Sequence, residues 1–277
     1  MRLVPGRRPD PACRTGRIRT LSVVLPVYNE ASTVGDVLDQ VLKLDLDGRE
    51  LELIVVESNS TDGTREIVQD YADRGLVKLI LQDRPRGKGY AVRTGLEAVT
   101  GDVILIQDGD LEYSVEDYPS LLAPIEAGRA SFVLGSRHVS GRPMRHFEES
   151  RRTSAMLNGA HWIFTGLFDA FYFVRLRDPF TMYKVFRREC LDGLGFVSDR
   201  FDFDWELVAK LVRAGHVPVE VPVTYESRDF KSGKKVRLFR DPLTWIVALV
   251  RFRFAPLAPR AAPMTAGVLR NGRPAQS

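Results

Sequence analysis

Short apolar runs and amphipathic stretches alternate along the first half of this chain of 277 residues. Runs that are apolar at successive positions predict strands buried on both faces, and the stretches between them have the three-to-four-residue spacing of helices. Strands are expected at 21–27, 51–56, 77–81, 103–106 and 132–134, with helices starting at 31 and 64 and covering 88–99 and 116–127. This order predicts an α/β fold with a doubly wound, mostly parallel sheet.

The second half of the chain has a different pattern. It predicts helices at 150–174, 203–214 and 241–254, and strands at 181–186 and 217–225. Its apolar stretches are shorter than the ~20 residues that a membrane-spanning helix needs. Contact with a membrane is therefore expected only at its surface.

Both ends of the chain are rich in Pro, Gly and Arg and have no apolar periodicity. This composition predicts disordered tails at 1–19 and 255–277 around a single catalytic domain at 20–240. The first 20 residues carry six arginines and lack the apolar stretch of an export signal, and the two cysteines, Cys13 and Cys190, have no metal-ligand spacing. A cytoplasmic protein is expected.

Basic residues gather near the carboxyl end, although the net charge is only +4. Residues 228–253 hold eight Lys or Arg against two Asp, and this run overlaps the apolar part of the helix expected at 241–254. A solvated charge run and an amphipathic helix at a membrane surface both fit this pattern. The second interpretation predicts a peripheral protein at the cytoplasmic face of the membrane.

The strongest local signal follows the strand at 103–106. Asp108, Asp110 and Glu112 stand at alternate positions around Gly109. Carboxylate oxygens suit Mg²⁺ or Mn²⁺, and an incomplete protein shell leaves positions for diphosphate oxygens. The alternative is an acidic turn that closes the strand.

Two phosphate-binding motifs are excluded. The sequence Arg86-Gly87-Lys88-Gly89 lacks the Ser or Thr after Lys and the upstream glycine of a P-loop. No GxGxxG follows the first strand, which disfavours a dinucleotide oxidoreductase.

Five motifs in order resemble family 2 glycosyltransferases, most closely the dolichol- or polyprenyl-phosphate sugar transferases. They cover nearly all of the expected domain and read VLPVYNE at 24–30, VVESNSTDGT at 55–64, GKG at 87–89, DGD at 108–110 and GSR at 135–137. The resemblance implies a nucleotide-binding GT-A-like fold. It also implies transfer of a sugar, with inversion, from a nucleotide-diphosphate donor.

The resemblance implies a nucleobase pocket formed by Pro26, Tyr28, Glu30 and Glu57. An aromatic ring and carboxylates suit the stacking and hydrogen bonding of a base. The family usually has paired aspartates where this chain has Glu57 and Ser58. Uridine and guanosine donors therefore both stay open.

Phosphate contacts are implied for four basic residues. Lys88 at the start of a helix is expected to face the donor diphosphate. Arg137, Arg151 and Arg228 resemble residues that the polyprenyl-phosphate transferases direct at phosphates. Asp108 and Asp110, with Glu112 as a third ligand, match the family's metal motif.

The acceptor decides whether a general base is needed. A polyprenyl or dolichyl phosphate is already anionic at neutral pH and needs none. A sugar or other hydroxyl acceptor, as in envelope polysaccharide or glycolipid synthesis, would need one, and Asp202, Asp204 and Glu206 are the candidates. The predicted catalytic set therefore includes Asp204 and Glu206.

Further alternatives stay open at this point. An aspartyl-phosphate hydrolase also places Asp-x-Asp after a strand, but it normally has Thr or Val where this chain has Leu111. A non-catalytic membrane-surface module would use only the basic segment. The aromatic side chains at 162–173 fit core packing or a groove for isoprene units. No nucleic-acid partner is expected.

Overall fold

The computed structural model describes residues 10, 12–138, 151–200, 202–226, 241–258 and 268–270. Eight strands form one sheet in the order β7-β5-β6-β4-β1-β2-β3-β8. The strands are β1 (Thr20–Val27), β2 (Glu50–Glu57), β3 (Lys78–Leu81), β4 (Val103–Ile106), β5 (Phe132–Ser136), β6 (Lys184–Arg187), β7 (Val219–Pro222) and β8 (Val268–Arg270). Every strand expected from the sequence is present.

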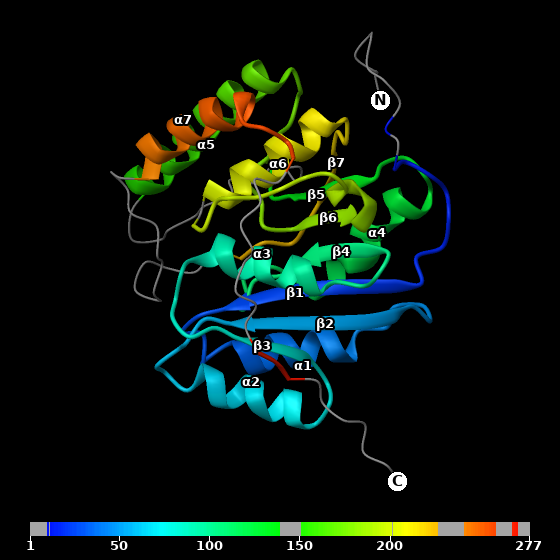
Figure 1. Cartoon of the computed structure of the whole chain (residues 1–277). Helices are drawn as coiled ribbons and strands as arrows, with labels where there is room; N and C mark the ends of the chain where they lie inside the picture. Colours follow the sequence, from blue (N-terminus) through cyan, green and yellow to red (C-terminus); the bar gives the residue numbers. More distant parts are fainter. Residues whose placement is uncertain are drawn as a thin grey trace.

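The helices also agree with the expectation to within a few residues at each end. They are α1 (Val34–Lys43), α2 (Thr64–Asp73), α3 (Lys88–Ala98), α4 (Tyr118–Glu126), α5 (Arg151–Tyr172), α6 (Asp202–Ala214) and α7 (Asp241–Phe254), with short 3₁₀ turns η1 (Val115–Asp117) and η2 (Arg188–Leu191). The mostly parallel α/β fold predicted from the sequence is confirmed (Figure 1).

The sheet is parallel from β3 through β2 and β1 to β4. Strand β6 runs antiparallel between β4 and β5, and β7 pairs in parallel with β5. The crossover of the chain between β1 and β4 is the kind of topological switch point beside which open α/β sheets bind ligands.

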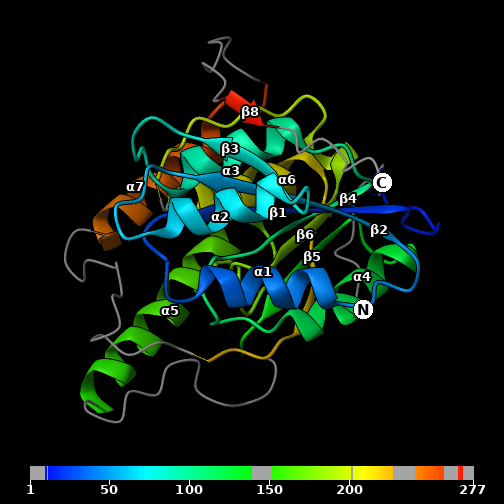
Figure 2. The same ribbon diagram turned by 90° about the horizontal axis from the view of Figure 1, so that it is seen from below.

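Helices cover both faces of the sheet (Figure 2). The helices α1, α2 and α4 pack on one face, and α3, α5, α6 and α7 lie on the other. Strand β1 shows why both faces can be covered. Val23 and Leu25 pack in the hydrophobic core under α1, α2 and α4, and Val24 packs in the core on the opposite face. Alternate side chains of a strand point to opposite faces, so an unbroken apolar run lets both faces be covered.

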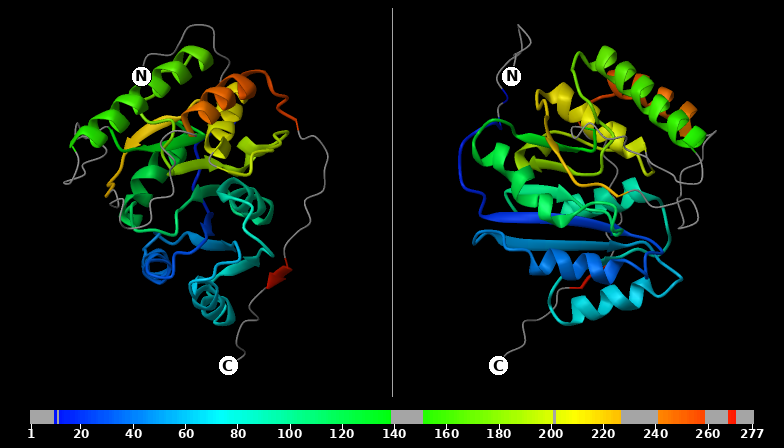
Figure 3. Two further views of the ribbon diagram at one scale, coloured as in Figure 1. Left: turned by 90° about the vertical axis from the view of Figure 1, so that its left-hand side faces the viewer. Right: turned by 180° about the vertical axis from the view of Figure 1, so that it is seen from behind.

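The helices α5, α6 and α7 form a layer at one side of the molecule, with α5 and α7 side by side (Figure 3). Phe164, Phe168 and Tyr172 of α5 are buried there, which confirms core packing for these three aromatic residues. Trp162 and Phe173 are 50% and 69% exposed. None of the described helices is both long and apolar enough to cross a membrane.

The amino-terminal segment is more ordered than its composition predicts. Ile18 is completely buried, Thr15 forms a β-bridge with Ala127, and the backbone N–H of Arg19 donates to Asp102 at 2.8 Å. The prediction of disorder is thus wrong for residues 12–19, because tertiary hydrogen bonds replace the missing periodicity. Strand β8 lies inside the carboxyl-terminal tail that was also expected to be disordered, and it pairs antiparallel with β3.

Candidate active site

Polar side chains follow the strands at the carboxyl edge of the parallel sheet. Strand β4 ends at Ile106, and the next residue, Gln107, is completely buried. Its Oε1 accepts hydrogen bonds from the hydroxyls of Tyr118 at 2.9 Å and Tyr183 at 2.8 Å. These bonds fix the chain just where it delivers Asp108.

Gly109 brings the acidic turn against the end of β1. A Cβ atom at this position would lie 2.8 Å from Cγ1 of Val27, which is closer than carbon atoms approach without a clash. The carbonyl oxygen of Gly109 also accepts from the hydroxyl of Thr33 at 2.9 Å. The Asp-Gly-Asp spacing therefore has a steric reason, because only glycine fits between the two carboxylates.

The three expected metal ligands do not converge as a set. Asp110 is 8% exposed, and its Oδ1 accepts the backbone N–H of Glu112 at 3.1 Å. The carboxylate of Glu112 instead accepts the hydroxyl of Tyr225 at 2.9 Å. The prediction of Glu112 as a ligand is not supported by this arrangement, since a bridge between Tyr113 and Tyr225 brings the Tyr225 ring to its side chain. Asp108 and Asp110 remain the oxygen donors that fit Mg²⁺ or Mn²⁺.

Lys88 lies in this acidic group, as the first residue of α3. Its ammonium forms an ion pair with Asp108. Burial lowers the pKa of Lys88, but Asp108, Asp204 and Asp110 together raise it above its usual value. The turn between β3 and α3 thus places a cation among the carboxylates, where it can also meet a diphosphate.

The glycines on either side of Lys88 allow this approach. A Cβ atom on Gly89 would lie 2.5 Å from Cβ of Phe203 and 2.7 Å from the carbonyl oxygen of Arg200. The start of α3 can therefore contact the loop before α6 directly. Asp204, in the first turn of α6, comes to the same region.

Lys184 is a site residue that the sequence analysis missed. It lies in β6, is completely buried, and its Nζ is 2.9 Å from Oδ1 of Asp204 and also contacts the carbonyl oxygen of Thr181. Burial lowers the pKa of Lys184, with Asp204 acting in the opposite direction. A lysine inside a strand among Tyr, Val and Phe was the available signal, because a buried lysine needs a partner.

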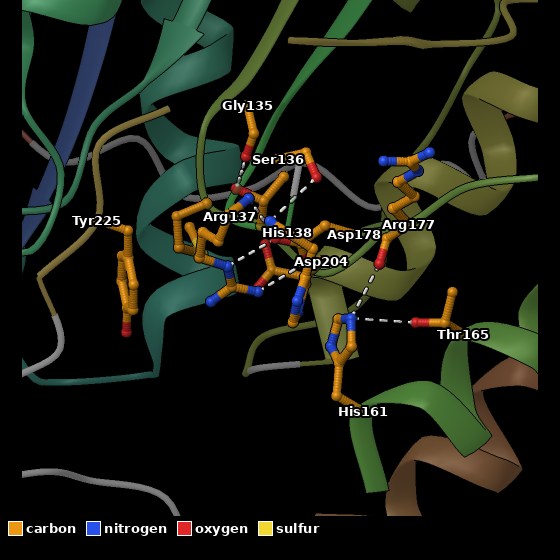
Figure 4. Close-up of polar contacts among 12 residues, drawn as sticks. Gly135, Ser136, Arg137, His138, His161, Thr165, Arg177, Asp178, Asp204 and Tyr225 are labelled. Carbon is orange, nitrogen blue, oxygen red and sulfur yellow. Dashed lines mark hydrogen bonds and ion pairs between the residues drawn. The ribbon is translucent and has the colours of Figure 1, made fainter. Parts of the chain in front are cut away.

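Arg137 and Asp178 form a third ion pair, at the carboxyl end of β5 (Figure 4). Nε and Nη2 of Arg137 each lie 2.7 Å from a different oxygen of Asp178, and the backbone N–H of Arg137 donates to the same carboxylate at 3.0 Å. The guanidinium lies 5.2 Å from the centroid of the Tyr225 ring. Asp178 is another residue that the sequence analysis missed. Its carboxylate holds the planar guanidinium of Arg137 in one orientation.

A cluster with metal-ligand chemistry lies beside this pair. Ligand atoms of His138, His161 and Asp178 lie within 4.8 Å of one another, the one such group of three among the residues described. Burial lowers the pKa of His161 to about 4, so its ring is neutral. The two imidazole rings pack against each other, with centroids 4.3 Å apart and planes tilted by 30°. Asp178 is already held by Arg137, so this cluster fits a structural contact better than an ion.

The expected nucleobase pocket is only partly accessible. Tyr28 is 37% exposed and Glu30 is half-buried, but Pro26 lies buried within β1. Glu57 is completely buried, with Oε1 accepting the backbone N–H of Ser60 at 2.6 Å and Oε2 paired with Arg65. Glu57 therefore forms the wall of this region, and its predicted contact with a base is wrong for this arrangement.

The three acidic residues of α6 have different positions. Asp204 is in the site, whereas Asp202 accepts the backbone N–H of Arg200 at 3.2 Å. Glu206 is completely buried and accepts the backbone N–H groups of Val197 and Ser198, in addition to pairing with Lys210. The prediction of Glu206 as a catalytic base is contradicted, since two residues along a helix point in different directions.

Two predicted phosphate contacts lie outside what the structure describes. The helix α5 begins at Arg151, but the side chain of this residue is outside the described set. Arg228 and the basic loop through residue 240 lie outside the described residues altogether. Asp62 accepts the backbone N–H and the hydroxyl of Thr64, the first residue of α2.

The sheet, its switch point and the acidic turn at its carboxyl edge define an open α/β protein with a candidate ligand site beside the switch point. The sequence matches the family model for glycosyl transferase family 2 over residues 22–195. Because this match covers more than half of the chain, the chain belongs to that family.

Among the curated relatives, the glycosyltransferase AglJ of Haloferax volcanii is 29% identical over 79% of this chain and 67% of its own length. The dolichol-phosphate mannosyltransferase of Pyrococcus furiosus is 28% identical over 75% of this chain and 57% of its own. An undecaprenyl-phosphate 4-deoxy-4-formamido-L-arabinose transferase of Shewanella sediminis is 29% identical over 66% and 53%. The chain thus spans between about half and two thirds of these relatives' lengths.

Solved structures share the fold. The glucosyl-3-phosphoglycerate synthase of Mycobacterium tuberculosis superimposes with a TM-score of 0.63 at 24% identity, over 86% of this chain and 82% of that one. A complex of the same enzyme with Mn²⁺, UDP and phosphoglyceric acid gives a TM-score of 0.61 at 22% identity. At this identity the likeness establishes the GT-A-like fold.

Proposed function

We propose that this chain transfers a sugar, with inversion, from a UDP- or GDP-linked donor to a polyprenyl or dolichyl phosphate. The observation that carries the proposal is the pairing of Lys88 with Asp108 beside Asp110, at the carboxyl edge next to the switch point. The carboxylate of Asp108 already pairs with the ammonium of Lys88 there. The arrangement suits a donor diphosphate that brings a divalent ion with it.

The donor would lie between three groups of this chain. Asp108 and Asp110 would hold Mg²⁺ or Mn²⁺, which supplies neutralisation of the leaving nucleoside diphosphate. Lys88 would turn from Asp108 to the diphosphate oxygens. Tyr28 and Glu30 would flank the nucleobase. The complexes of the mycobacterial synthase with UDP and Mn²⁺ or Mg²⁺ support this assignment.

The acceptor would approach from the side of Arg137. A phosphate monoester carries its own negative charge near neutral pH, so it can attack without a general base. The carboxylate of Asp204 is already engaged by the ammonium of Lys184. The names of the Pyrococcus and Shewanella relatives support a polyprenyl phosphate.

A hydroxyl acceptor is the second candidate, because Asp204 is the one α6 carboxylate that lies in the site. The test offers purified protein UDP- and GDP-sugars, Mn²⁺ or Mg²⁺, and either a short polyprenyl phosphate or its free alcohol. Metal-dependent transfer to the phosphate alone supports the first function. Transfer to hydroxyl acceptors alone supports the second, and no binding of any donor contradicts both.

We also propose that the protein acts peripherally at the cytoplasmic face of the membrane. The supporting feature is a group of exposed apolar side chains on α5, α7 and the residue after α5. They are Trp162, Ile163, Leu167, Phe173, Val247, Val250 and Phe254. Arg251 and Arg253 lie among them and would meet anionic headgroups.

Flotation with vesicles that contain anionic lipid tests this surface. Val247→Asp combined with Phe254→Asp should reduce vesicle binding several-fold at unchanged thermal stability. Leu76→Asp is the control, because Leu76 is 38% exposed in the turn between α2 and β3, on another part of the molecule. Equal binding by the double variant and the control would contradict the peripheral role.

A further inference from the structure

Arg65 is fixed across the ends of two neighbouring strands. It lies in the first turn of α2, and its Nε donates to Oε2 of Glu57 at 2.5 Å. Its Nη2 donates to the backbone carbonyl oxygen of Gln82 at 2.8 Å. Glu57 ends β2, and Gln82 follows β3. The guanidinium therefore sits at the carboxyl edge, where ligands of such sheets bind.

Glu57 and Arg65 differ in their access to a ligand. The Glu57 side chain has no exposed surface, whereas the Arg65 side chain is 32% exposed. Glu57 also accepts the backbone N–H of Ser60, so both of its oxygens are engaged. A carboxylate in this state orients the arginine, and the arginine is the charged group that reaches the surface.

The same edge carries the aromatic residue expected to stack on a base. The backbone N–H of Asn29 donates to the hydroxyl of Ser60 at 3.0 Å, and the N–H of Thr61 donates to Oδ1 of Asn29 at 2.9 Å. These bonds tie the loop after β1, which bears Tyr28, to the loop after β2. Both loops border one region, and Arg65 is held to it through Glu57.

We propose that Arg65 selects the donor's nucleobase by donating a hydrogen bond to a carbonyl oxygen on the base edge, and that Glu57 is its positioning residue. This inference rests on the proposed nucleotide-sugar donor. A guanidinium has five N–H groups and no acceptor, and two of them are used in the contacts above. It favours uracil or guanine, with an oxygen at the pyrimidine 4 or purine 6 position, over cytosine or adenine, with an amino group there.

The test uses pairs of nucleoside diphosphates in which an amino group replaces the oxygen at this position and the adjacent ring nitrogen changes from N–H to an acceptor. Binding of UDP against CDP, and of IDP against ADP, is measured by calorimetry with Mg²⁺ present. The wild-type protein should favour the oxo base in each pair by about tenfold, the effect of one hydrogen bond that an amino group cannot accept. Arg65→Met should bring both ratios close to one. Arg74→Met, at the other end of α2 and paired with Asp70, should keep the wild-type ratios.

A second variant guards against a folding defect. Arg65→Met leaves Glu57 buried without its partner, so the double variant Arg65→Met with Glu57→Gln removes that charge as well. It should fold and should also show no selection. Glu57→Gln alone keeps Arg65 but loosens it, so the ratios should fall to intermediate values.

The outcomes separate this inference from the proposed function. Wild-type binding with a clear preference that persists in both Arg65 variants would overturn the role of Arg65 while leaving the donor class intact. Wild-type binding without any preference would do the same. If no nucleoside diphosphate binds to the wild-type protein, the proposed function fails together with the inference.

Discussion

The two edges of the sheet hold the same kinds of charged residues in different states. At the amino edge, Glu52 accepts hydrogen bonds from Ser22, Lys78 and Thr100. At the carboxyl edge, Asp108 has an ion pair with Lys88 and stays partly exposed. A carboxylate with a full set of internal partners stabilises the fold, and a partly exposed one paired with a lysine can exchange that lysine for a ligand.

The amino-terminal segment extends this contrast. Nδ1 of His216 lies 2.7 Å from Asp10, and the hydroxyl of Ser131 donates to the same carboxylate. The hydrogen bond with Asp10 raises the pKa of His216 to about 10 although burial acts to lower it. This pair ties the amino-terminal segment to the body at the edge away from the site. The comparison therefore predicts activity effects at one edge and stability effects at the other.

The largest effect is expected for Asp110→Asn. Loss of one charge that would hold the divalent ion should lower transfer about 10³-fold, since that charge matters most when the diphosphate leaves. Thermal stability should change little. Asp102→Asn, a matched carboxylate at the amino edge, should keep transfer near the wild-type rate. Comparable loss in both variants would end the distinction between the edges.

Lys184→Met should lower transfer about 10²-fold and also destabilise the protein, because it leaves the carboxylate of Asp204 without its buried partner. The double variant Lys184→Met with Asp204→Leu removes both charges and should recover most of the stability. Calorimetric unfolding and transfer are measured together. Recovery of transfer as well as stability would show that Asp204 has no role beyond its ion pair.

Glu52→Gln should lower the free energy of unfolding by about 2 kcal/mol, because it weakens several buried hydrogen bonds. Nucleotide affinity should not change. Burial acts to raise the pKa of Glu52, but these hydrogen bonds lower it to about 2. The wild-type stabilisation is thus full above the ordinary pKa near 4.5 and is lost as the pH falls towards 2. Urea unfolding between pH 2 and 5 should show a weaker pH dependence in the variant.

His216→Gln should have the smallest effect, about 1 kcal/mol at neutral pH, because the glutamine amide can still donate a hydrogen bond to the carboxylate of Asp10. A histidine whose pKa rises on folding stabilises the protein fully below its ordinary value of 6.5. The contribution then declines as the pH rises towards 10. Between pH 6 and 10 the free energy of unfolding should fall more steeply for the wild-type protein than for the variant. Parallel pH dependences would contradict the ion pair.

The prediction of the fold succeeded where periodicity is strong. Strand β4 and helix α7 have the boundaries that the apolar pattern indicates. It failed for residues 12–19, because hydrogen bonds to Asp102 and a bridge to Ala127 come from distant parts of the chain. No local pattern in the sequence encodes such contacts.

The sequence by itself determined the class of the protein, because apolar runs define the strands and short motifs such as Asp-Gly-Asp follow them directly. Only the tertiary structure decided which charged groups can meet a ligand. It enclosed Glu57 and Glu206 and left Arg65 partly exposed, and it paired Lys184 with Asp204 across two elements. Burial and partnership depend on the packing of α2 and α6 against the sheet, which residue types alone do not specify.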